Sequence, residues 1–252
     1  MAEKLLEVNN IYKSYDGKTN ILKGISFELN KGDFIAVMGP SGAGKTTFLN
    51  CISTLDTPSD GSILIHQKNL LAMSNHEIAD FRYTSLGFIF QNMNLLESMT
   101  VFDNIAIPLI LDNVDEKIIE EKVFAISKQL NIAKLLDKHP CQCSGGEMQR
   151  IAIARAIIND PEIIIADEPT GNLDTANSKT IMKILYDLNQ KGVSIILVTH
   201  DNVVASFSQK LLYLKDGRMV TMINRNNGSQ KEYLNCINEL TNKDSLLSVL
   251  DE

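Results

Sequence analysis

Short apolar runs separated by turn residues characterise the beginning of the chain. Leu5 to Ile11, Ile21 to Leu29 and Phe34 to Met38 are rich in β-forming residues. Asp16-Gly17 and Lys31-Gly32-Asp33 lie between these runs and are typical of turns. The pattern therefore predicts three short strands before Gly39, and a further strand, Ser62 to Ile65, after the first expected helix.

The second half of the chain alternates between strand and helix patterns. Glu162 to Ala166 and Val193 to Val198 predict buried strands, and a helix is expected from about Ser144 to Asn159. A further helix between the two strands carries one apolar face from Ile181 to Leu188. Strands that are almost purely apolar and alternate with helices indicate a parallel sheet covered on both faces, so the predicted fold class is α/β.

The middle of the chain, from about Asn75 to Lys138, is helical in pattern apart from one strand, Leu86 to Phe90. Asn104 to Leu111 and Asp115 to Leu130 have helix-like apolar spacing. Pro108 is expected to interrupt the first of these helices, because proline lacks a backbone N–H group.

The chain changes character after a predicted hairpin, in which Leu211 to Leu214 and Met219 to Met222 pair around a turn. Beyond Asn224, an amphipathic set is expected at Tyr233, Ile237 and Leu240. We therefore predict a main domain at residues 1–223 and a C-terminal extension at residues 224–252. The extension is expected to pack against the core or to pair protomers.

Composition narrows the classes of protein. Hydrophobic residues make up 44% and charged residues 22%, which is typical of a folded globular chain. The net charge of −7 argues against nucleic acid as the main partner. The longest apolar run, Val193 to Val198, is far shorter than the ~20 residues that a membrane span needs. The N-terminal sequence MAEKLLEVNN has no signal-peptide pattern, so any membrane role is expected to be peripheral or through a partner.

The cysteines and histidines do not form metal-site patterns. Of the four cysteines only Cys141 and Cys143 are close in sequence, and this spacing lacks the second ligand pair of a zinc site. Reduced thiols are the expected state. His66, His76 and His139 have no ligand-spaced partners and are expected to be structural or solvated.

Residues 39–46 read GPSGAGKT and match the phosphate-binding P-loop pattern G-x-x-x-x-G-K-[ST] at every fixed position. An apolar strand precedes them and a helix follows, which is the context the motif requires and argues against a chance glycine-rich turn. The backbone N–H groups and the helix start are expected to hold phosphates. Lys45 adds a cation for the β- and γ-phosphates, and Thr46 offers a hydroxyl ligand to Mg²⁺.

A second candidate lies at the end of a buried strand, where residues 163–168 read IIIADE. Ligands of open α/β sheets bind at such carboxyl ends. Asp167 is the expected carboxylate of a Mg²⁺ site, and Glu168 is placed to polarise an attacking water. Two solvated acids at a strand end are the competing interpretation, which the presence of the P-loop disfavours.

Residues 143–147 read CSGGE and resemble the signature motif of the ABC ATPase family, usually written LSGGQ. They lie about 100 residues after the P-loop and about 20 before the acidic strand, as in that family. Other landmarks occur in order: Tyr15 is similar to the adenine-stacking aromatic, Gln91 to the Q-loop glutamine, residues 171–174 to the D-loop and His200 to the switch histidine. The resemblance covers about residues 4–222.

The resemblance implies a P-loop NTPase fold with a RecA-like core, an N-terminal antiparallel β part and a helical subdomain at about residues 92–158. It implies ATP and Mg²⁺ as cofactors, with Glu168 and His200 catalytic and Thr46, Gln91 and Asp167 at Mg²⁺. The residues expected at ATP are Tyr15, Gly39, Pro40, Ser41, Gly42, Ala43, Gly44, Lys45, Thr46, Thr47, Gln91, Ser144, Gly145, Gly146, Glu147 and Asp174.

The signature suggests an oligomer. Ser144, Gly145 and Gly146 open a helix, so N–H groups and a hydroxyl present a second anion site in the same chain. The family implies a nucleotide-dependent head-to-tail homodimer, in which each ATP lies between one protomer's P-loop and its partner's signature. Arg150 is expected to support the helix. Cys143 replaces the usual leucine, and we expect slightly altered packing without loss of activity.

Segments around these motifs resemble the branch with macrolide exporters, lipoprotein-release ATPases and the cell-division ABC ATPase. Within it, LNCISTLD after the P-loop, the sequence after His200 and the segment from Gln230 to Tyr233 resemble the bacitracin- and lantibiotic-resistance type. This implies an integral-membrane permease partner, at the cytoplasmic face of the cell membrane, and a sensor kinase reached through the permease.

Alternatives to this type remain open. They are lipoprotein release, macrolide export, cell-division or cell-wall remodelling through a permease-like partner, and a soluble ABC ATPase of DNA repair or translation. The last is disfavoured by the single P-loop and the lack of a heptad run.

Overall fold

The computed structural model describes residues 3–226 and 228–250. The chain divides into two compact units, a first unit of Met1–Ala72 with Ile196–Glu252 and a second unit of Met73–Ile195. Strand β8 (Ser194–Val198) contributes residues to both. Residues 1–2, 227 and 251–252 of the predicted domain ranges lie outside the described residues. The predicted division after residue 223 stays a prediction.

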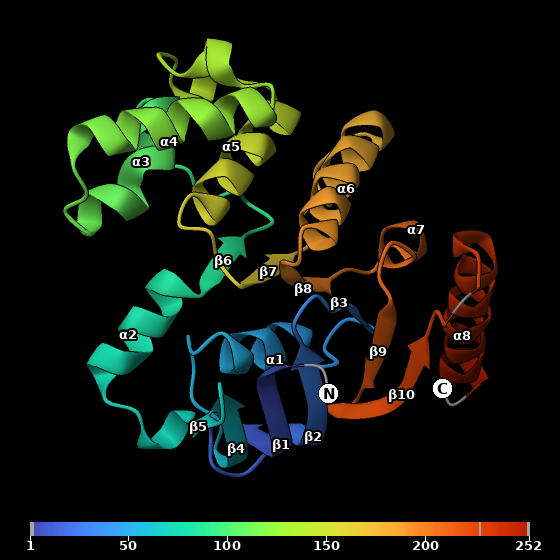
Figure 1. Cartoon of the computed structure of the whole chain (residues 1–252). Helices are drawn as coiled ribbons and strands as arrows, with labels where there is room; N and C mark the ends of the chain where they lie inside the picture. The colour runs from blue at the N-terminus through green and yellow to red at the C-terminus, as the bar shows by residue number, and fades with distance from the viewer. Residues whose placement is uncertain (1–2, 227, 251–252) are drawn as a thin grey trace. The chain divides into compact units, whose positions relative to one another are not determined.

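The first unit contains an antiparallel sheet with the strand order β2-β1-β4-β5. Its strands are β1 (Lys4–Ser14), β2 (Asn20–Asn30), β4 (Asp60–Ile65) and β5 (Lys68–Asn69). In the register, Val8 of β1 pairs with Phe27 on one side and with Ile63 on the other. Helix α1 (Lys45–Ile52) packs on this sheet through an edge-to-face contact between Phe48 and Phe27, whose ring centroids lie 5.3 Å apart (Figure 1).

The first unit also contains part of a second sheet, in which the strand order is β10-β9-β3-β8. These strands are β3 (Phe34–Met38), β8, β9 (Lys210–Lys215) and β10 (Arg218–Asn224). Strand β3 runs parallel to β9, while β9 and β10 form the predicted hairpin. All five residues of β3 are buried, which is the burial expected of a strand covered on both faces.

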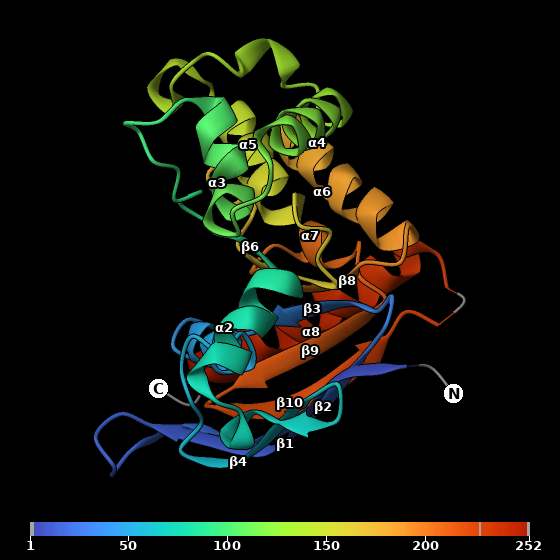
Figure 2. The same ribbon diagram turned by 60° about the vertical axis from the view of Figure 1, so that its left-hand side comes forward.

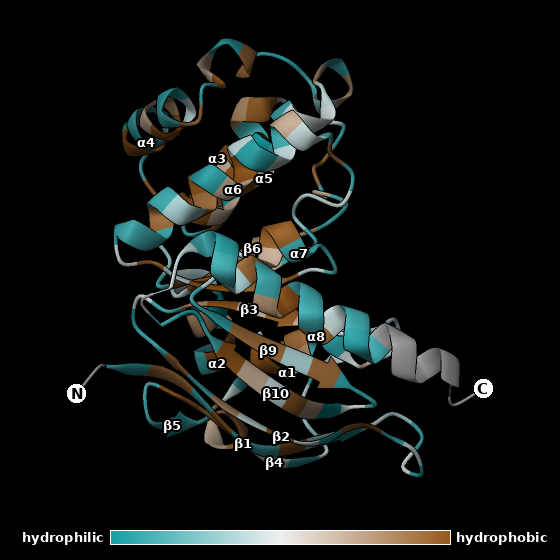
Figure 3. Ribbon diagram, turned by 90° about the vertical axis from the view of Figure 1, so that its right-hand side faces the viewer, coloured by the Kyte–Doolittle hydropathy of each residue, from teal (hydrophilic) through white to brown (hydrophobic). Residues whose placement is uncertain are grey.

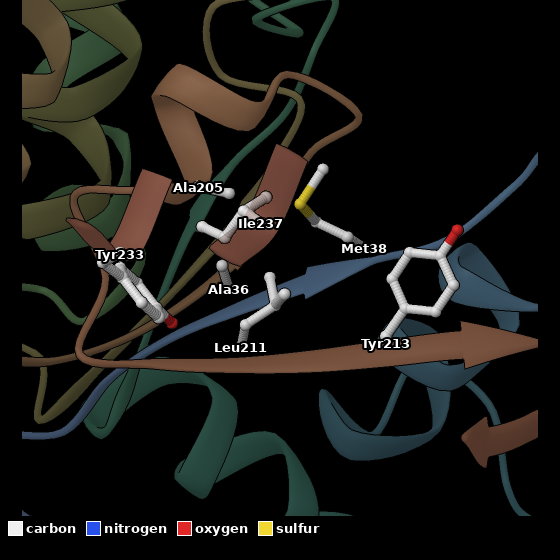
Figure 4. Packing of buried hydrophobic residues seen from close by; sticks show 7 residues of the cluster. All are labelled: Ala36, Met38, Ala205, Leu211, Tyr213, Tyr233 and Ile237. Carbon is white, nitrogen blue, oxygen red and sulfur yellow. The ribbon is translucent and has the colours of Figure 1, made fainter. Parts of the chain in front are cut away.

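Two helices of the first unit, α7 (Asn202–Ala205) and α8 (Gln230–Leu250), lie against these strands (Figure 3). Tyr233 and Ile237 of α8 are buried in a cluster with residues of β3, β9 and α7, and Leu240 packs against the same cluster (Figure 4). The three apolar residues predicted to share one face therefore do so. The helix is longer than the single amphipathic set that the pattern predicted.

The second unit contains the strand order β8-β7-β6, with β6 (Leu86–Ile89) parallel to β7 (Ile163–Asp167). The described α-helices of the second unit are α2 (Asn75–Thr84), α3 (Val101–Leu111), α4 (Glu116–Gln129), α5 (Gly145–Ile157) and α6 (Thr175–Gln190). Helices α3, α4, α5 and α6 lie together (Figure 2). The parallel pairings in both units confirm the predicted α/β class.

Two predictions for the middle of the chain were wrong. Pro108 does not interrupt its helix, because α3 continues through it to Leu111. Proline removes one backbone hydrogen bond, but Ile105 and Leu109 on the same helix are buried, and such packing supplies most helical stability in proteins. The segment from Gln91 to Thr100 is not helical, because Met93 and Asn94 adopt left-handed backbone conformations.

Within the described part of the chain, no helix combines the length and the apolar character needed to cross a membrane.

Candidate functional site

The P-loop lies in the first unit, between the end of β3 at Met38 and the start of α1 at Lys45. Gly39 has φ 151°, and a Cβ atom at this position would overlap the carbonyl oxygen of Leu214 in β9. Any larger residue would therefore push the loop off the sheet. The Lys45 ammonium donates to the carbonyl oxygens of Gly39 and Pro40, both at 2.8 Å, so it lies against the loop that it is predicted to serve.

The start of α1 differs from every other described α-helix, because no side chain caps it. Its N-cap is Gly44, and no acidic residue lies in its first turn. A Ser, Thr or Asp side chain caps α2 to α7, and Ser229 does the same for α8. A helix start without its own side-chain acceptor suits an anion, since the first-turn N–H groups and the helix dipole both favour negative charge. The observation therefore fits a phosphate at this position.

Tyr15 lies beside the P-loop helix and is 61% exposed. Its hydroxyl interacts with the Asp56 carboxylate and with Thr47 of α1, and the hydrogen bond to Asp56 raises the pKa of Tyr15. The Lys13 ammonium lies 4.8 Å from the ring centroid. The structure therefore holds an exposed aromatic ring close to the predicted phosphate site, as adenine stacking would require.

His200 belongs to the same unit and follows the end of β8 by two residues, after Thr199. Thr199 donates its backbone N–H to the carbonyl oxygen of Val37 at 3.2 Å, two residues before Gly39. Asp201 caps α7 by accepting from the N–H groups of Val203 and Val204. The segment that carries His200 is thus anchored to the strand that leads into the P-loop.

The acidic strand end lies in the second unit. Residues 163–166 of β7 are at most 1% exposed, whereas Asp167 and Glu168 are half-buried. Glu168 has φ 46°, a left-handed conformation that is uncommon for residues other than glycine. Such backbone conformations cost about 1–3 kcal/mol and cluster at functional sites. The strained backbone therefore occurs at Glu168, the residue that is predicted to orient the attacking water.

Gln91 lies against the segment that follows Glu168. Asn172 donates its side-chain N–H to the carbonyl oxygen of Gln91 at 3.4 Å, and Gly171 faces the Gln91 amide. The second unit therefore brings together three of its predicted site elements, the Q-loop glutamine, the acidic strand end and the beginning of the D-loop.

Two polar side chains that the sequence analysis did not single out fix the loop after Gln91. The Arg155 guanidinium donates to the carbonyl oxygens of Met93 and Asn94 at 2.7 and 2.6 Å. Asn104 is fully buried and bonds both the N–H and the carbonyl group of Leu96. No sequence motif marks these contacts: Arg155 lies on α5, 61 residues after Asn94, whereas Asn104 lies on α3, eight residues after Leu96.

The signature helix α5 begins with a capping box. Ser144 Oγ accepts from the N–H of Glu147, and the Glu147 carboxylate accepts from the N–H and hydroxyl groups of Ser144. The hydrogen bonds from Ser144 lower the pKa of Glu147, so a negative charge already occupies this helix start. The Ser144 hydroxyl is thus engaged, and the N–H groups of Gly145 and Gly146 lie outside the box. The two predicted phosphate-binding helix starts are therefore not equivalent.

The side chains that could bind the predicted Mg²⁺ are few. Among the described residues, no cluster of three or more His, Cys, Asp or Glu side chains could hold a metal ion. Mg²⁺ is commonly bound through one or two protein oxygens together with substrate phosphates, and the Thr46 hydroxyl of the first unit and the Asp167 carboxylate of the second are each oxygen donors of this kind.

The family model with the description "ABC transporter" matches residues 22–171. The chain belongs to the ABC transporter family. The ABC transporter ATP-binding protein YxdL of Bacillus subtilis is 45% identical over 232 residues, which cover 91% of this chain and 90% of that protein. The bacitracin export ATP-binding protein BceA of Halalkalibacterium halodurans is 42% identical over 233 residues, which cover 91% of this chain and 92% of BceA.

Similarity to solved structures supports this family assignment. The chain superposes with a TM-score of 0.80 on one chain of a dimeric structure of the ATP-binding cassette MJ0796 bound to ADP and Pi, at 34% sequence identity over 87% of this chain and 98% of that one. The predicted family and fold are thereby confirmed, and the chain is an ABC-type ATPase that binds adenine nucleotide.

A residue that the sequence analysis did not single out lies against the signature helix. Asn177 of α6 packs directly against Gly146, so a Cβ atom at Gly146 would overlap its side-chain amide. Asp174 of the D-loop accepts from both the backbone N–H and the side-chain N–H of Asn177, at 2.9 and 2.7 Å. Asn177 therefore connects the D-loop to the signature helix within one chain.

Gly146→Ala is expected to lower the free energy of unfolding by about 1–3 kcal/mol, because the added methyl group must displace Asn177. Gly145→Ala is the matched control. Its Cβ would lie 3.5 Å from Leu173, an ordinary contact, and alanine favours the helix. Urea unfolding of both variants checks this, and equal stabilities would show that the Asn177 contact does not constrain residue 146.

Proposed function

We propose that this ATPase powers an integral-membrane permease that confers resistance to antimicrobial peptides acting on the cell wall, of the bacitracin or lantibiotic type. The observation that carries the proposal is the match to BceA, a bacitracin export ATP-binding protein, over 92% of its length at 42% identity. The chain would act at the cytoplasmic face of the cell membrane, held there by the permease. The permease would also link it to a sensor kinase.

The proposed reaction is hydrolysis of ATP to ADP and phosphate within a head-to-tail dimer. Lys45 and the P-loop amides hold the phosphates, and the uncapped start of α1 supports this role. Glu168 accepts the proton of the attacking water and orients it, and His200 stabilises charge that develops on the γ-phosphate. Gly145 and Gly146 of the partner's signature offer their N–H groups to the same nucleotide.

Mg²⁺ would be held by Thr46, Asp167 and Gln91, and when bound it would neutralise phosphate charge. Thr46 stands in the first turn of α1, and Asp167 is the last residue of β7. Both are oxygen donors, which Mg²⁺ prefers. Tyr15 and Asp174 of the D-loop are further proposed contacts of the nucleotide.

A hollow in the second unit supports the proposal that the chain binds a permease. It has a volume of 360 Å³ and is lined by Leu86 to Phe88, Phe90, Pro108, Leu111 and Arg155, among others. The rings of Phe88 and Phe90 stack at 5.6 Å, and Leu111 is 74% exposed. An apolar hollow with an exposed rim suits an amphipathic helix. We propose that it receives a cytoplasmic helix of the permease.

One experiment tests both the partner and the resistance type. Cells of the source organism that lack this chain are complemented with the wild type, with Leu111→Arg or with Phe124→Arg, each carrying an affinity tag. Phe124 is a matched control, because it is exposed on α4 but does not line the hollow. Bacitracin susceptibility and co-purification of a permease from gently solubilised membranes are measured together.

The wild type and Phe124→Arg are expected to restore bacitracin resistance and to retain the permease, whereas Leu111→Arg loses both and keeps its ATPase activity. Restored resistance to macrolides alone would favour the macrolide-export alternative. A permease that co-purifies with cell-wall hydrolases would favour the remodelling alternative. The lack of any membrane partner would overturn the proposed transporter role and leave the ATPase assignment intact.

A further inference from the structure

Helix α8 lies outside the residues that the family model matches, yet it packs on the elements that carry the nucleotide motifs of the first unit. Tyr233 and Ile237 are 3% and 0% exposed, in a cluster that includes Met38, the last residue before the P-loop (Figure 4). The cluster also contains Ala205 of α7, the helix that follows His200. The C-terminal helix therefore contacts both segments.

Directed polar contacts accompany the apolar ones. Asn202 is the first residue of α7 and follows His200 by two positions. Its side-chain amide donates to Asn238 Oδ1 at 2.8 Å and to Thr241 Oγ1 at 3.0 Å, both on α8. Both donor hydrogens of this amide are thus directed at one helix, which fixes the orientation of the Asn202 side chain.

The opposite side of the His200 segment is also anchored. Thr199 is fully buried, and its N–H bonds the carbonyl oxygen of Val37 in β3. His200 therefore lies between an anchor on β3, made by Thr199, and an anchor on α8, made by Asn202, and only His200 and Asp201 separate the two. Because the connection is this short, a displacement of Asn202 is expected to move His200 as well.

Helix α8 is held independently of these amide contacts. Near its C-terminal part, the Asp244 carboxylate accepts from the Tyr213 hydroxyl at 2.8 Å and from the Lys215 ammonium at 2.6 Å, both in β9. The burial of Tyr233 and Ile237 fixes its N-terminal part. The helix is therefore docked by other contacts as well as by the hydrogen bonds from Asn202. The main effect of those bonds is expected on α7 and on the segment that carries His200.

We infer that Asn238 and Thr241 of α8 are positioning residues for ATP hydrolysis, which act through Asn202 to set the placement of His200. The inference rests on the proposed role of His200 at the γ-phosphate. The C-terminal helix then affects the rate of the chemical step more than nucleotide binding, because the hydrogen bonds that Asn238 and Thr241 accept come from Asn202, in the segment that carries His200.

The test compares two double variants of the full chain. Asn238→Leu with Thr241→Val removes both acceptors at similar volume, whereas Asn238→Asp with Thr241→Ser keeps an acceptor oxygen at each position. The first pair is expected to lower kcat about tenfold, with less than about a twofold change in KM for ATP, because small misplacements of a catalytic group reduce turnover. The second pair and the exposed-face control Glu239→Ala should stay within about twofold of the wild type.

A double-mutant cycle with His200→Ala separates this inference from the proposed function. In the His200→Ala background the Leu/Val pair should cause less than about a twofold further loss. A renewed tenfold loss there, a wild-type kcat for the Leu/Val pair, or equal losses in both pairs would each overturn the positioning role. A wild-type rate for His200→Ala alone would instead overturn the catalytic assignment of His200.

Discussion

Glu168→Gln is expected to slow ATP hydrolysis at least about a hundredfold, since a positioned general base contributes about 10²–10⁴-fold. The amide keeps the size of the side chain but cannot accept the proton of the attacking water. Because the P-loop and Tyr15 are unchanged, ATP binding should remain. The variant should therefore accumulate as an ATP-bound dimer, which size-exclusion chromatography with radiolabelled ATP would detect.

Glu120→Gln is the matched control for this variant. Glu120 is an exposed residue of α4 in the same unit, so the same chemical change there should leave turnover within about twofold. Hydrolysis at the wild-type rate by Glu168→Gln would show that another group orients the water, despite the unusual backbone conformation at this position.

Lys45→Met is expected to lower kcat/KM for ATP at least about a hundredfold, and it should do so by weakening binding as well as turnover. The ammonium lies against the P-loop, where it bonds the carbonyl oxygens of Gly39 and Pro40, and a charge-assisted hydrogen bond from it to a phosphate would contribute about 1.5–3 kcal/mol to binding. Methionine keeps the apolar stem and removes the charge. Calorimetry with a slowly hydrolysed ATP analogue, alongside the turnover assay, separates the two effects.

Lys68→Met serves as the control, because Lys68 is an exposed lysine of β5 in the same unit. It should bind the analogue as the wild type does. Unchanged affinity in Lys45→Met would contradict the assignment of the phosphate cradle. ATP binding is thus expected to be retained in Glu168→Gln and lost in Lys45→Met.

Sequence patterns predicted the elements whose cause is local. The P-loop is a contiguous segment between a strand and a helix, and its residues lie where the motif requires. The buried strand that ends at Asp167 is recognisable from four consecutive apolar residues. The Ser144–Glu147 capping box follows the S-x-x-E pattern and could have been predicted from the sequence, together with the engaged state of the Ser144 hydroxyl.

Contacts between distant segments could not be predicted in this way. Asn177 packs on Gly146, Arg155 holds the loop after Gln91, and Asn202 bonds α8, and in each case the partners are far apart in sequence. The course of α3 through Pro108 has the same origin, because the packing of its buried face outweighs a local preference. Such contacts form only in the completed fold, whereas the spacing of a motif gives information only about residues that are close in sequence.

The uncapped start of α1 has a thermodynamic consequence. The other described α-helices complete their first turn with a side chain of this chain, whereas α1 has no such cap and is proposed to bind the phosphates of the nucleotide there. A ligand that binds only the native state adds about 2.7 kcal/mol of stability at a hundred times its Kd. The stability of this ATPase is therefore expected to depend on the concentration of adenine nucleotide, so that the nucleotide-free chain would unfold more readily than the nucleotide-bound one.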